Sequence, residues 1–279
     1  MGQTEEHDIL NKTTKIKKAK NEHIPSTVQA DTLFTFTSHV DYLITTLKNA
    51  MVSPRYCVED LSYLKIQGIK KMAFPMKCFC DINMHKLESH LSWYGYYGLA
   101  FSKEWGMTNG IQPIQYINPT SLLREDFASA FNSALKTGAT ASGEPVSVMK
   151  SYLLHQLMYY KPYSGMIENR NTKKRQRKCF TDECEWRYIP SVSGAGFQQL
   201  YYDENIINAG VLNDISNSME GLQAVSLKFE YADLKYIIVK SMEDFVKLTE
   251  AISTFGVDDA TEHEIISKVI IWDNSKGDF

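Results

Sequence analysis

Residues 31–50 read DTLFTFTSHVDYLITTLKNA, and this stretch predicts a strand that leads directly into a helix. The run from Leu33 to Phe36 is short and apolar, as in buried strands. Ser38 and Asp41 then have the spacing of a capping box. The apolar residues that follow recur at helical spacing, namely Val40, Leu43, Ile44 and Leu47. Pro54 ends this unit.

Further strands are predicted wherever β-branched and aromatic residues form short apolar runs. These runs are Met72 to Cys80, Tyr96 to Phe101, Ile111 to Ile117, Glu185 to Ile189, Val225 to Phe229 and Leu234 to Val239. Pro113 places the third run at a sheet edge or a bulge, because proline cannot donate a ladder hydrogen bond.

Helices are predicted between these strands. Pro119 is expected at the first position of one helix, whose apolar stripe comprises Leu123, Phe127, Ala130, Phe131 and Ala134. A second helix covers residues 148–160, and a capping box of Ser241 and Asp244 starts a third, which Gly256 closes. Strands and helices mix without a regular βαβ rhythm, so the predicted fold class is α+β, a mixed sheet with flanking helices.

Composition limits the classes of function. The chain has 279 residues, 43% of them hydrophobic, and a formal net charge of −3, which excludes a globally basic nucleic-acid binder. The longest apolar stretches are far shorter than the roughly 20 residues that span a bilayer, so no membrane contact is expected. Acidic residues near the start argue against a secretory signal, and the five cysteines are interpreted as free thiols in a reducing, cytoplasmic environment.

The chain divides into an arm and a body. Residues 1–30 predict a flexible Lys-rich arm, and residues 31–279 predict a single α+β domain. Residues 161–178 predict a polar loop containing a basic cluster, namely Lys173, Lys174, Arg175, Arg177 and Lys178. Such a cluster is more often a solvated loop than a nucleic-acid site, so only weak or no binding to nucleic acid is expected.

Five separated motifs carry a family resemblance. They are residues 34–38 (FTFTS), 53–56 (SPRY), 76–81 (MKCFCD), 94–106 (YGYYGLAFSKEWG) and 183–188 (ECEWRY). Their order and wording resemble the AbiGi family, described as the antitoxin-like partner in two-gene abortive-infection systems against phages. The resemblance implies a phage-defence function exerted by binding, with a nucleotidyltransferase-like toxin as the cognate partner.

A second resemblance implies an enzyme. The first strand, its helix and the Pro54-Arg55-Tyr56 turn are similar to the first element of ADP-ribosyltransferase-like folds, with NAD as the implied cofactor, although Phe34 or Thr35 stands where those folds have His or Arg. The Glu-X-Glu spacing would put two carboxylates on one strand face, where they could stabilise an oxocarbenium ion. The implied catalytic residues are Glu183, Glu185, Tyr94 and Tyr97, and the implied ligand-binding residues are Thr35, Thr37 and Arg55.

Structural explanations stand beside these functional ones. Glu185 could simply pair with Arg187 or Lys103, and the tyrosines could be core or interface aromatics. Cys78 and Cys80 have one residue between them, whereas zinc sites favour two to four, so no metal site is predicted. Whether the chain is an enzyme or a binding protein stays open at this point.

Overall fold

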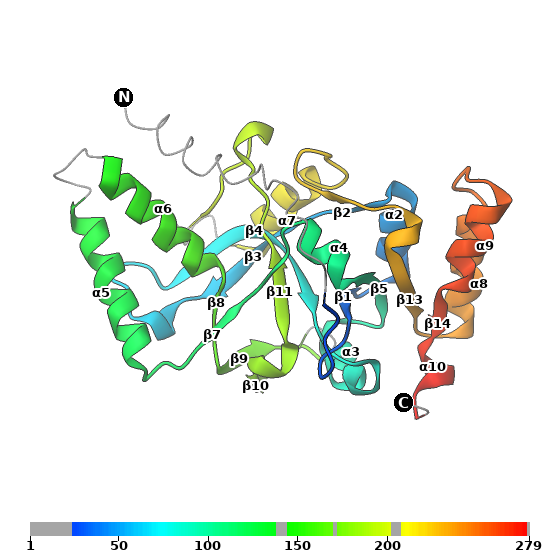
Figure 1. The fold of residues 1–279 in the computed structure, drawn as a ribbon, viewed down its shortest axis with the longest axis horizontal. Helices are drawn as coiled ribbons and strands as arrows, with labels where there is room; N and C mark the ends of the chain where they lie inside the picture. Colours follow the sequence, from blue (N-terminus) through cyan, green and yellow to red (C-terminus); the bar gives the residue numbers. More distant parts are fainter. Residues whose placement is uncertain (1–23, 138–143, 170–171, 202–207, 278–279) are drawn as a thin grey trace.

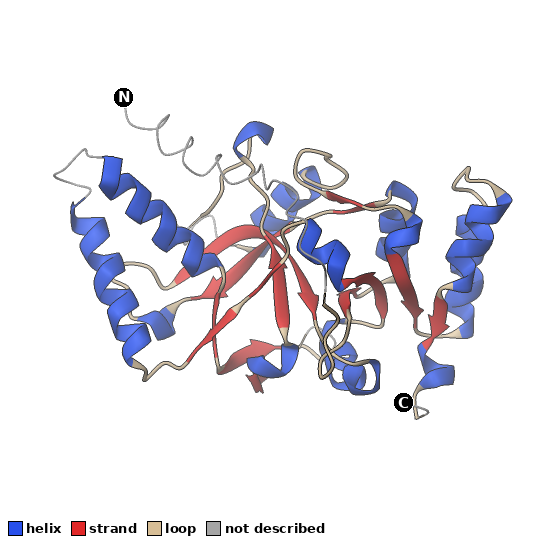
Figure 2. Cartoon of the chain, viewed as in Figure 1, coloured by secondary structure: helices blue, strands red, loops and turns tan. Residues whose placement is uncertain are grey.

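A mixed eight-stranded sheet forms the centre of the computed structural model, which describes residues 24–137, 144–169, 172–201 and 208–277 (Figures 1 and 2). The strands are β1 (Thr32–Thr37), β2 (Met51–Val52), β3 (Arg55–Asp60), β4 (Lys71–Cys80), β5 (Tyr97–Ser102), β6 (Gln112–Pro113), β7 (Gln115–Ile117), β8 (Tyr160–Pro162), β9 (Ser164–Glu168), β10 (Arg175–Cys179), β11 (Glu185–Tyr188), β12 (Leu227–Lys228), β13 (Leu234–Val239) and β14 (Val269–Ile271). The sheet runs in the order β14-β13-β5-β1-β4-β11-β6, with β3 also paired to β4.

Helices cover both faces of this sheet. They are α2 (Val40–Asn49), α3 (Leu87–Tyr94), α4 (Lys103–Thr108), α5 (Leu122–Thr137), α6 (Glu144–Met158), α7 (Ala209–Ser218), α8 (Met242–Ile252), α9 (Asp259–Ser267) and α10 (Trp272–Ser275). Helices α5 and α6 lie at one end of the molecule and α8 and α9 at the other (Figure 1). The observed class is the predicted α+β arrangement of a mixed sheet with flanking helices.

The alternation of side chains along β1 assigns the two faces. Leu33 belongs to an apolar cluster with residues of α2 and α8, whereas Phe34 belongs to a separate cluster with Leu87 and Leu91 of α3. Successive strand residues point to opposite faces. The sheet therefore has one face covered by α2 and α8 and another covered by α3, and both are buried.

The start of α2 differs from the prediction. His39 is the N-cap, its backbone is extended and no side chain caps the helix, so Ser38 and Asp41 do not form a capping box. β1 ends at Thr37, and the extended His39 precedes the first helical residue, Val40, so the N-cap lies one residue later than predicted. Asp41 instead pairs with Lys247 of α8 at 2.7 Å. The second capping box, Ser241 with Asp244 at the start of α8, is confirmed.

The predicted third strand and the helix after it also change. β6 and β7 replace one strand, because β6 pairs with β11 at the end of the main sheet while β7 pairs in parallel with β8. Pro113 lies at that sheet edge, as predicted. Asn118, Pro119 and Ser121 form a turn, and the helix begins only at Leu122. Phe127 and Phe131 are buried as expected, but Leu123 and Ala130 are exposed.

Residues 161–178, predicted as a loop, contain strands instead. β8 ends at Pro162, and β9 and β10 form an antiparallel hairpin outside the main sheet, with Arg175 opposite Glu168. Lys- and Arg-rich segments have low intrinsic strand propensity, so local sequence gives little sign of this pairing. At the carboxyl end, α8 and α9 connect β13 to the parallel strand β14.

The predicted arm at residues 1–30 lies largely outside the described residues. The single domain over residues 31–279 stays a prediction. Within the described ranges, no helix combines the length and apolar character that crossing a bilayer requires.

Candidate functional site

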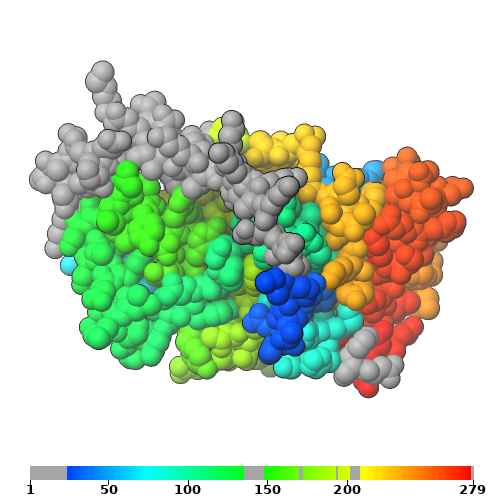
Figure 3. Space-filling model, in the orientation of Figure 1, coloured from blue at the N-terminus to red at the C-terminus, as the bar shows by residue number. Residues whose placement is uncertain are grey.

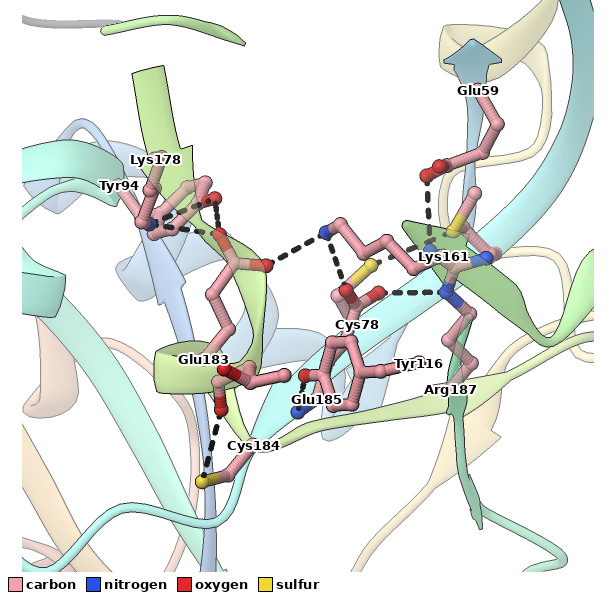
Figure 4. A network of polar contacts seen from close by, with 12 residues as sticks. Glu59, Cys78, Tyr94, Tyr116, Lys161, Lys178, Glu183, Cys184, Glu185 and Arg187 are labelled. Atoms are coloured by element: carbon pink, nitrogen blue, oxygen red, sulfur yellow. Dashed lines mark hydrogen bonds and ion pairs between the residues drawn. The ribbon is translucent and has the colours of Figure 1, made fainter. Parts of the chain in front are cut away.

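Strand β11 carries the centre of the candidate site on one of its two faces. Glu185 and Arg187 are both buried and point to the same side, opposite Cys80 and Cys78 of β4. Trp186 points to the other side, into the cluster with α2 and α8. The charged side chains therefore lie on the α3 face of the sheet, where a network of ion pairs surrounds them (Figure 4).

Arg187 is completely buried and has three acceptors. Its Nε donates to Glu185 Oε1 at 2.7 Å, its Nη2 to Glu59 Oε1 of β3 at 3.0 Å, and its Nη1 to the carbonyl of Met158 at 2.6 Å. Met158 is the last residue of α6, and carbonyls at a helix end have no partner within the helix. Arg187 thus joins two acidic side chains to the end of a helix.

Lys161 bridges the two carboxylates of the Glu-X-Glu motif. Its Nζ lies 2.6 Å from Glu185 Oε2 and 2.7 Å from Glu183 Oε2, and the Phe180 ring lies beneath the ammonium at 4.8 Å. Both oxygens of Glu185 are therefore occupied, one by Lys161 and the other by Arg187.

Glu183 extends the network toward α3. It ends a 3₁₀ helix, η4 (Phe180–Glu183), rather than lying on β11, so the two glutamates do not share one strand. Its Oε1 accepts from the Tyr94 hydroxyl and pairs with Lys178 of β10 at 2.8 Å. The Lys178 ammonium also lies over the rings of Tyr94 and Trp93, at 4.3 and 4.8 Å from their centroids.

The charges of the network balance. Three carboxylates face three cations, namely Glu59, Glu183 and Glu185 against Lys161, Lys178 and Arg187. Burial alone would raise the pKa of Glu185, but the charges of Arg187 and Lys161 outweigh it and hold that pKa well below its usual range. Burial would also raise the pKa of Glu183. The charges of Lys161 and Lys178 outweigh burial, so this pKa is lowered as well.

These directions limit the chemistry of Glu183 and Glu185. A carboxyl with a lowered pKa stays ionised at neutral pH and is a poor general acid. A carboxylate that stabilises a cationic transition state must face the substrate, yet both oxygens of Glu185 already face protein cations. The network therefore neutralises itself and holds β11, β8, β10 and the end of α6 together.

Two features border the network. Cys78 of β4 lies directly opposite Arg187, and the surrounding protein raises the pKa of this thiol well above its usual range, chiefly by desolvation. His90 of α3 packs against Tyr94 with ring centroids 4.6 Å apart and planes tilted by 41°, and burial together with the nearby Lys178 charge lowers the pKa of His90 to about 4. His90 is therefore neutral at physiological pH.

The structure brings together only part of the predicted site. Tyr94, Glu183 and Glu185 meet, as described above. Thr35 and Thr37 lie on the same face of β1 as Leu33, and Tyr97 lies opposite Thr37, with its hydroxyl bonded to Asp244 at 3.2 Å. These three residues are therefore on the other face of the sheet from Glu185.

Arg55 also lies apart from the network. Its guanidinium donates to Asn217 and Asn213 of α7 at 3.1 and 3.3 Å. Of the two predicted structural partners of Glu185, Arg187 is confirmed, whereas Lys103 pairs with Asp81 at 2.8 Å.

Three members of the network lie outside the predicted site residues. The sequence places Lys161 in a predicted polar loop, Glu59 lies in no motif, and Arg187 is predicted only as a structural partner of Glu185. The alternation of Glu185 and Arg187 along one strand was a usable signal, because it predicts a shared face. No local signal identifies Glu59 or Lys161.

The basic cluster divides between two surfaces. Lys173, Lys174, Arg175 and Arg177 are exposed on the β9–β10 hairpin, whereas Lys178 points inward to Glu183. A cavity of about 330 Å³ lies elsewhere, between α3 and α10, and is lined by Met84, His85, Glu88, Trp272, Lys276 and Gly277. Among the described residues, no three His, Cys, Asp or Glu side chains are grouped to hold a metal ion.

Comparison with known proteins identifies the family. Residues 49–240, which include every member of the ion network, match the family described as "Putative abortive phage resistance protein AbiGi, antitoxin". The abortive phage resistance protein AbiGi of Lactococcus lactis subsp. cremoris is 30% identical over 245 residues, covering 81% of this chain and 98% of that protein. No solved structure matches the chain. With most of its length matched in both comparisons, the chain belongs to the AbiGi family of abortive phage resistance proteins.

Proposed function

We propose that this chain acts as the antitoxin of an abortive phage-infection system and restrains a toxin protein by binding it, without catalysing a reaction. The observation that carries the binding role is the occupation of both Glu185 oxygens by Lys161 and Arg187. A carboxylate held in this way already has a protein cation on each oxygen, and its pKa is too low for proton donation. The family description supports the antitoxin role.

The partner in this proposal is a nucleotidyltransferase-like toxin. This choice follows from the resemblance to the AbiGi family, and an antitoxin family implies a toxin partner. The chain itself would add no chemistry to the toxin and would act by occupying one of its surfaces.

Growth of bacteria that express the two proteins tests the antitoxin role. The neighbouring gene is induced alone, this chain is induced alone, and both are induced together. Growth arrest by the neighbour alone, relieved by co-expression, is the expected result. Growth arrest by this chain alone would overturn the proposal, as would failure of co-expression to relieve the arrest at equal toxin levels.

One observation favours a second candidate, an NAD-dependent ADP-ribosyltransferase-like effector. Glu183 and Glu185 lie next to the aromatic Tyr94, as a nicotinamide site would require. Glu185→Gln removes the negative charge and keeps the shape, so NAD consumption by the wild type that disappears in this variant would favour the enzyme. Equal absence of NAD consumption in both proteins favours the antitoxin.

A further inference from the structure

The β9–β10 hairpin has an inner and an outer face. In an antiparallel pair, directly opposite residues point to the same side. Arg175 faces Glu168 and Arg177 faces Met166, and all four are exposed. Lys178, next to Arg177, points the other way and enters the ion network. The outer face is therefore free of the body of the protein.

The inner face holds the hairpin rigidly. Lys178 is fixed by the Glu183 carboxylate and two aromatic rings. Gly165, opposite Lys178, lies so close to Phe180 that an added Cβ would be 2.8 Å from the Phe180 ring. The strand leading into the hairpin is also tied down, since the Tyr163 amide donates to the Ile117 carbonyl at 3.0 Å. The outer face is preorganised, which lowers the entropy cost of binding.

The outer face combines charge with apolar surface. Lys173 and Lys174 at the turn add to Arg175 and Arg177. The Met166 side chain, 56% exposed, lies directly opposite Arg177, and Tyr163, 54% exposed, precedes β9. In Figure 3 the yellow-green atoms of this region lie at the lower edge of the molecule. Arginine, tyrosine and methionine are enriched in protein–protein interfaces.

The pattern favours a protein partner over nucleic acid. Affinity for phosphates rises with the positive charge of a surface, and Glu168, directly opposite Arg175, reduces that charge on this face. Lys178, the fifth cation of the cluster, is already neutralised by Glu183. Met166 at the middle of the face offers no hydrogen bond and no ring for base stacking. Four exposed cations beside the apolar Met166 side chain instead match an acidic protein surface with an apolar patch.

We infer that the outer face of the β9–β10 hairpin, with Arg175, Arg177 and Met166 at its centre, is the surface that binds an acidic face of the toxin. The inference rests on the proposed antitoxin function and assigns its contact surface. The ion network then positions the hairpin through Lys178 instead of contacting the toxin.

Binding measurements with purified full-length chains test the surface. The probe is the protein encoded by the neighbouring gene, titrated at low and at physiological salt. Arg175→Glu combined with Arg177→Glu is expected to weaken binding at least about tenfold, because it reverses two interface charges. Met166→Asp is expected to weaken binding too. Lys48→Glu with Lys70→Glu, two exposed lysines outside the hairpin, is the matched control and should bind like the wild type.

The possible outcomes distinguish failure of the assigned binding surface from failure of the proposed antitoxin function. Near-wild-type binding by both hairpin variants, with unchanged thermal midpoints, would overturn the assigned surface while leaving growth rescue intact. Growth rescue by a wild-type chain that does not bind the neighbour would also overturn it. A fluorescent single-stranded RNA bound submicromolarly at physiological salt, and lost in the Arg175/Arg177 variant, would assign the face to nucleic acid instead. Tight binding without growth rescue would reject the antitoxin function, and the variants would still test the surface.

Discussion

Lys161→Met is the sharpest test of the ion network. The change removes one ammonium and keeps a similar unbranched side chain. It leaves Glu183 Oε2 and Glu185 Oε2 without the cation that now lies 2.7 and 2.6 Å away. Lys178 and Arg187 stay in place and still pair with the other carboxylate oxygens.

The expected loss of stability is large. Removing one partner of a buried ion pair costs about 3–5 kcal/mol, because the remaining charge stays buried without compensation. Because Lys178 and Arg187 still pair with the two carboxylates, we expect a loss at the lower end of this range, about 3 kcal/mol. Against a typical free energy of unfolding of about 5–15 kcal/mol, this loss is a substantial fraction.

The stability that Lys161→Met loses should depend on pH. In the wild type the lowered pKa values of Glu183 and Glu185 contribute stability above the unfolded value of about 4.3, and this stability is lost as pH falls through the folded values. Without Lys161, burial is opposed by one cation fewer, so both pKa values should rise relative to the wild type. The variant then loses less stability than the wild type as pH falls, so the gap between the two proteins should narrow at acidic pH.

Urea unfolding followed by circular dichroism measures both effects. Lys247→Met is the matched control, because its ion pair with Asp41 is equally short at 2.7 Å but the side chains are 50% and 69% exposed. An exposed pair contributes about 0–1 kcal/mol. A loss below about 1 kcal/mol for Lys161→Met, or a loss that does not shrink at low pH, would refute the account of the network.

Three further changes follow from the same contacts. His90→Gln should flatten the dependence of the free energy of unfolding on pH between about pH 6.5 and 4. Because the pKa of His90 is lowered to about 4, the wild type loses up to about 3 kcal/mol of stability as pH falls through this window. An unchanged profile by urea titration would contradict this role. Arg187→Lys keeps the charge, but a lysine cannot reach all three acceptors, which include the Met158 carbonyl. We expect the free energy of unfolding to fall by about 2–4 kcal/mol, whereas wild-type unfolding would show that charge alone suffices. Gly165→Ala should cost about 1–3 kcal/mol, since its Cβ would meet Phe180, and should speed amide exchange in the hairpin, whereas unchanged exchange would argue against tight packing there.

The sequence by itself determined the elements whose signals are local. Apolar runs identified β1, β4, β5, β11 and β13, and the Ser241–Asp244 capping box identified the start of α8. These features depend on side-chain periodicity and on hydrogen bonds within four residues, which neighbouring residues specify. The five motifs also identified the family that the comparisons confirm.

Only the tertiary structure decided the site. Glu59 and Lys161 reach Arg187, Glu183 and Glu185 because β3, β8 and β11 are brought together across long stretches of chain. The β9–β10 hairpin and the parallel return to β14 also depend on pairing that local propensity does not specify.

The same limit explains why only part of the predicted transferase site comes together. Sequence motifs place Thr35 and Tyr97 near Glu185 along neighbouring strands but do not state which face each side chain occupies once the strands are in register. A shift of one residue moves a side chain to the other face of a sheet. The register of β1 with β5 turns Thr35 and Tyr97 toward α2 and α8, while that of β11 with β4 turns Glu185 toward α3, so the sheet itself separates them.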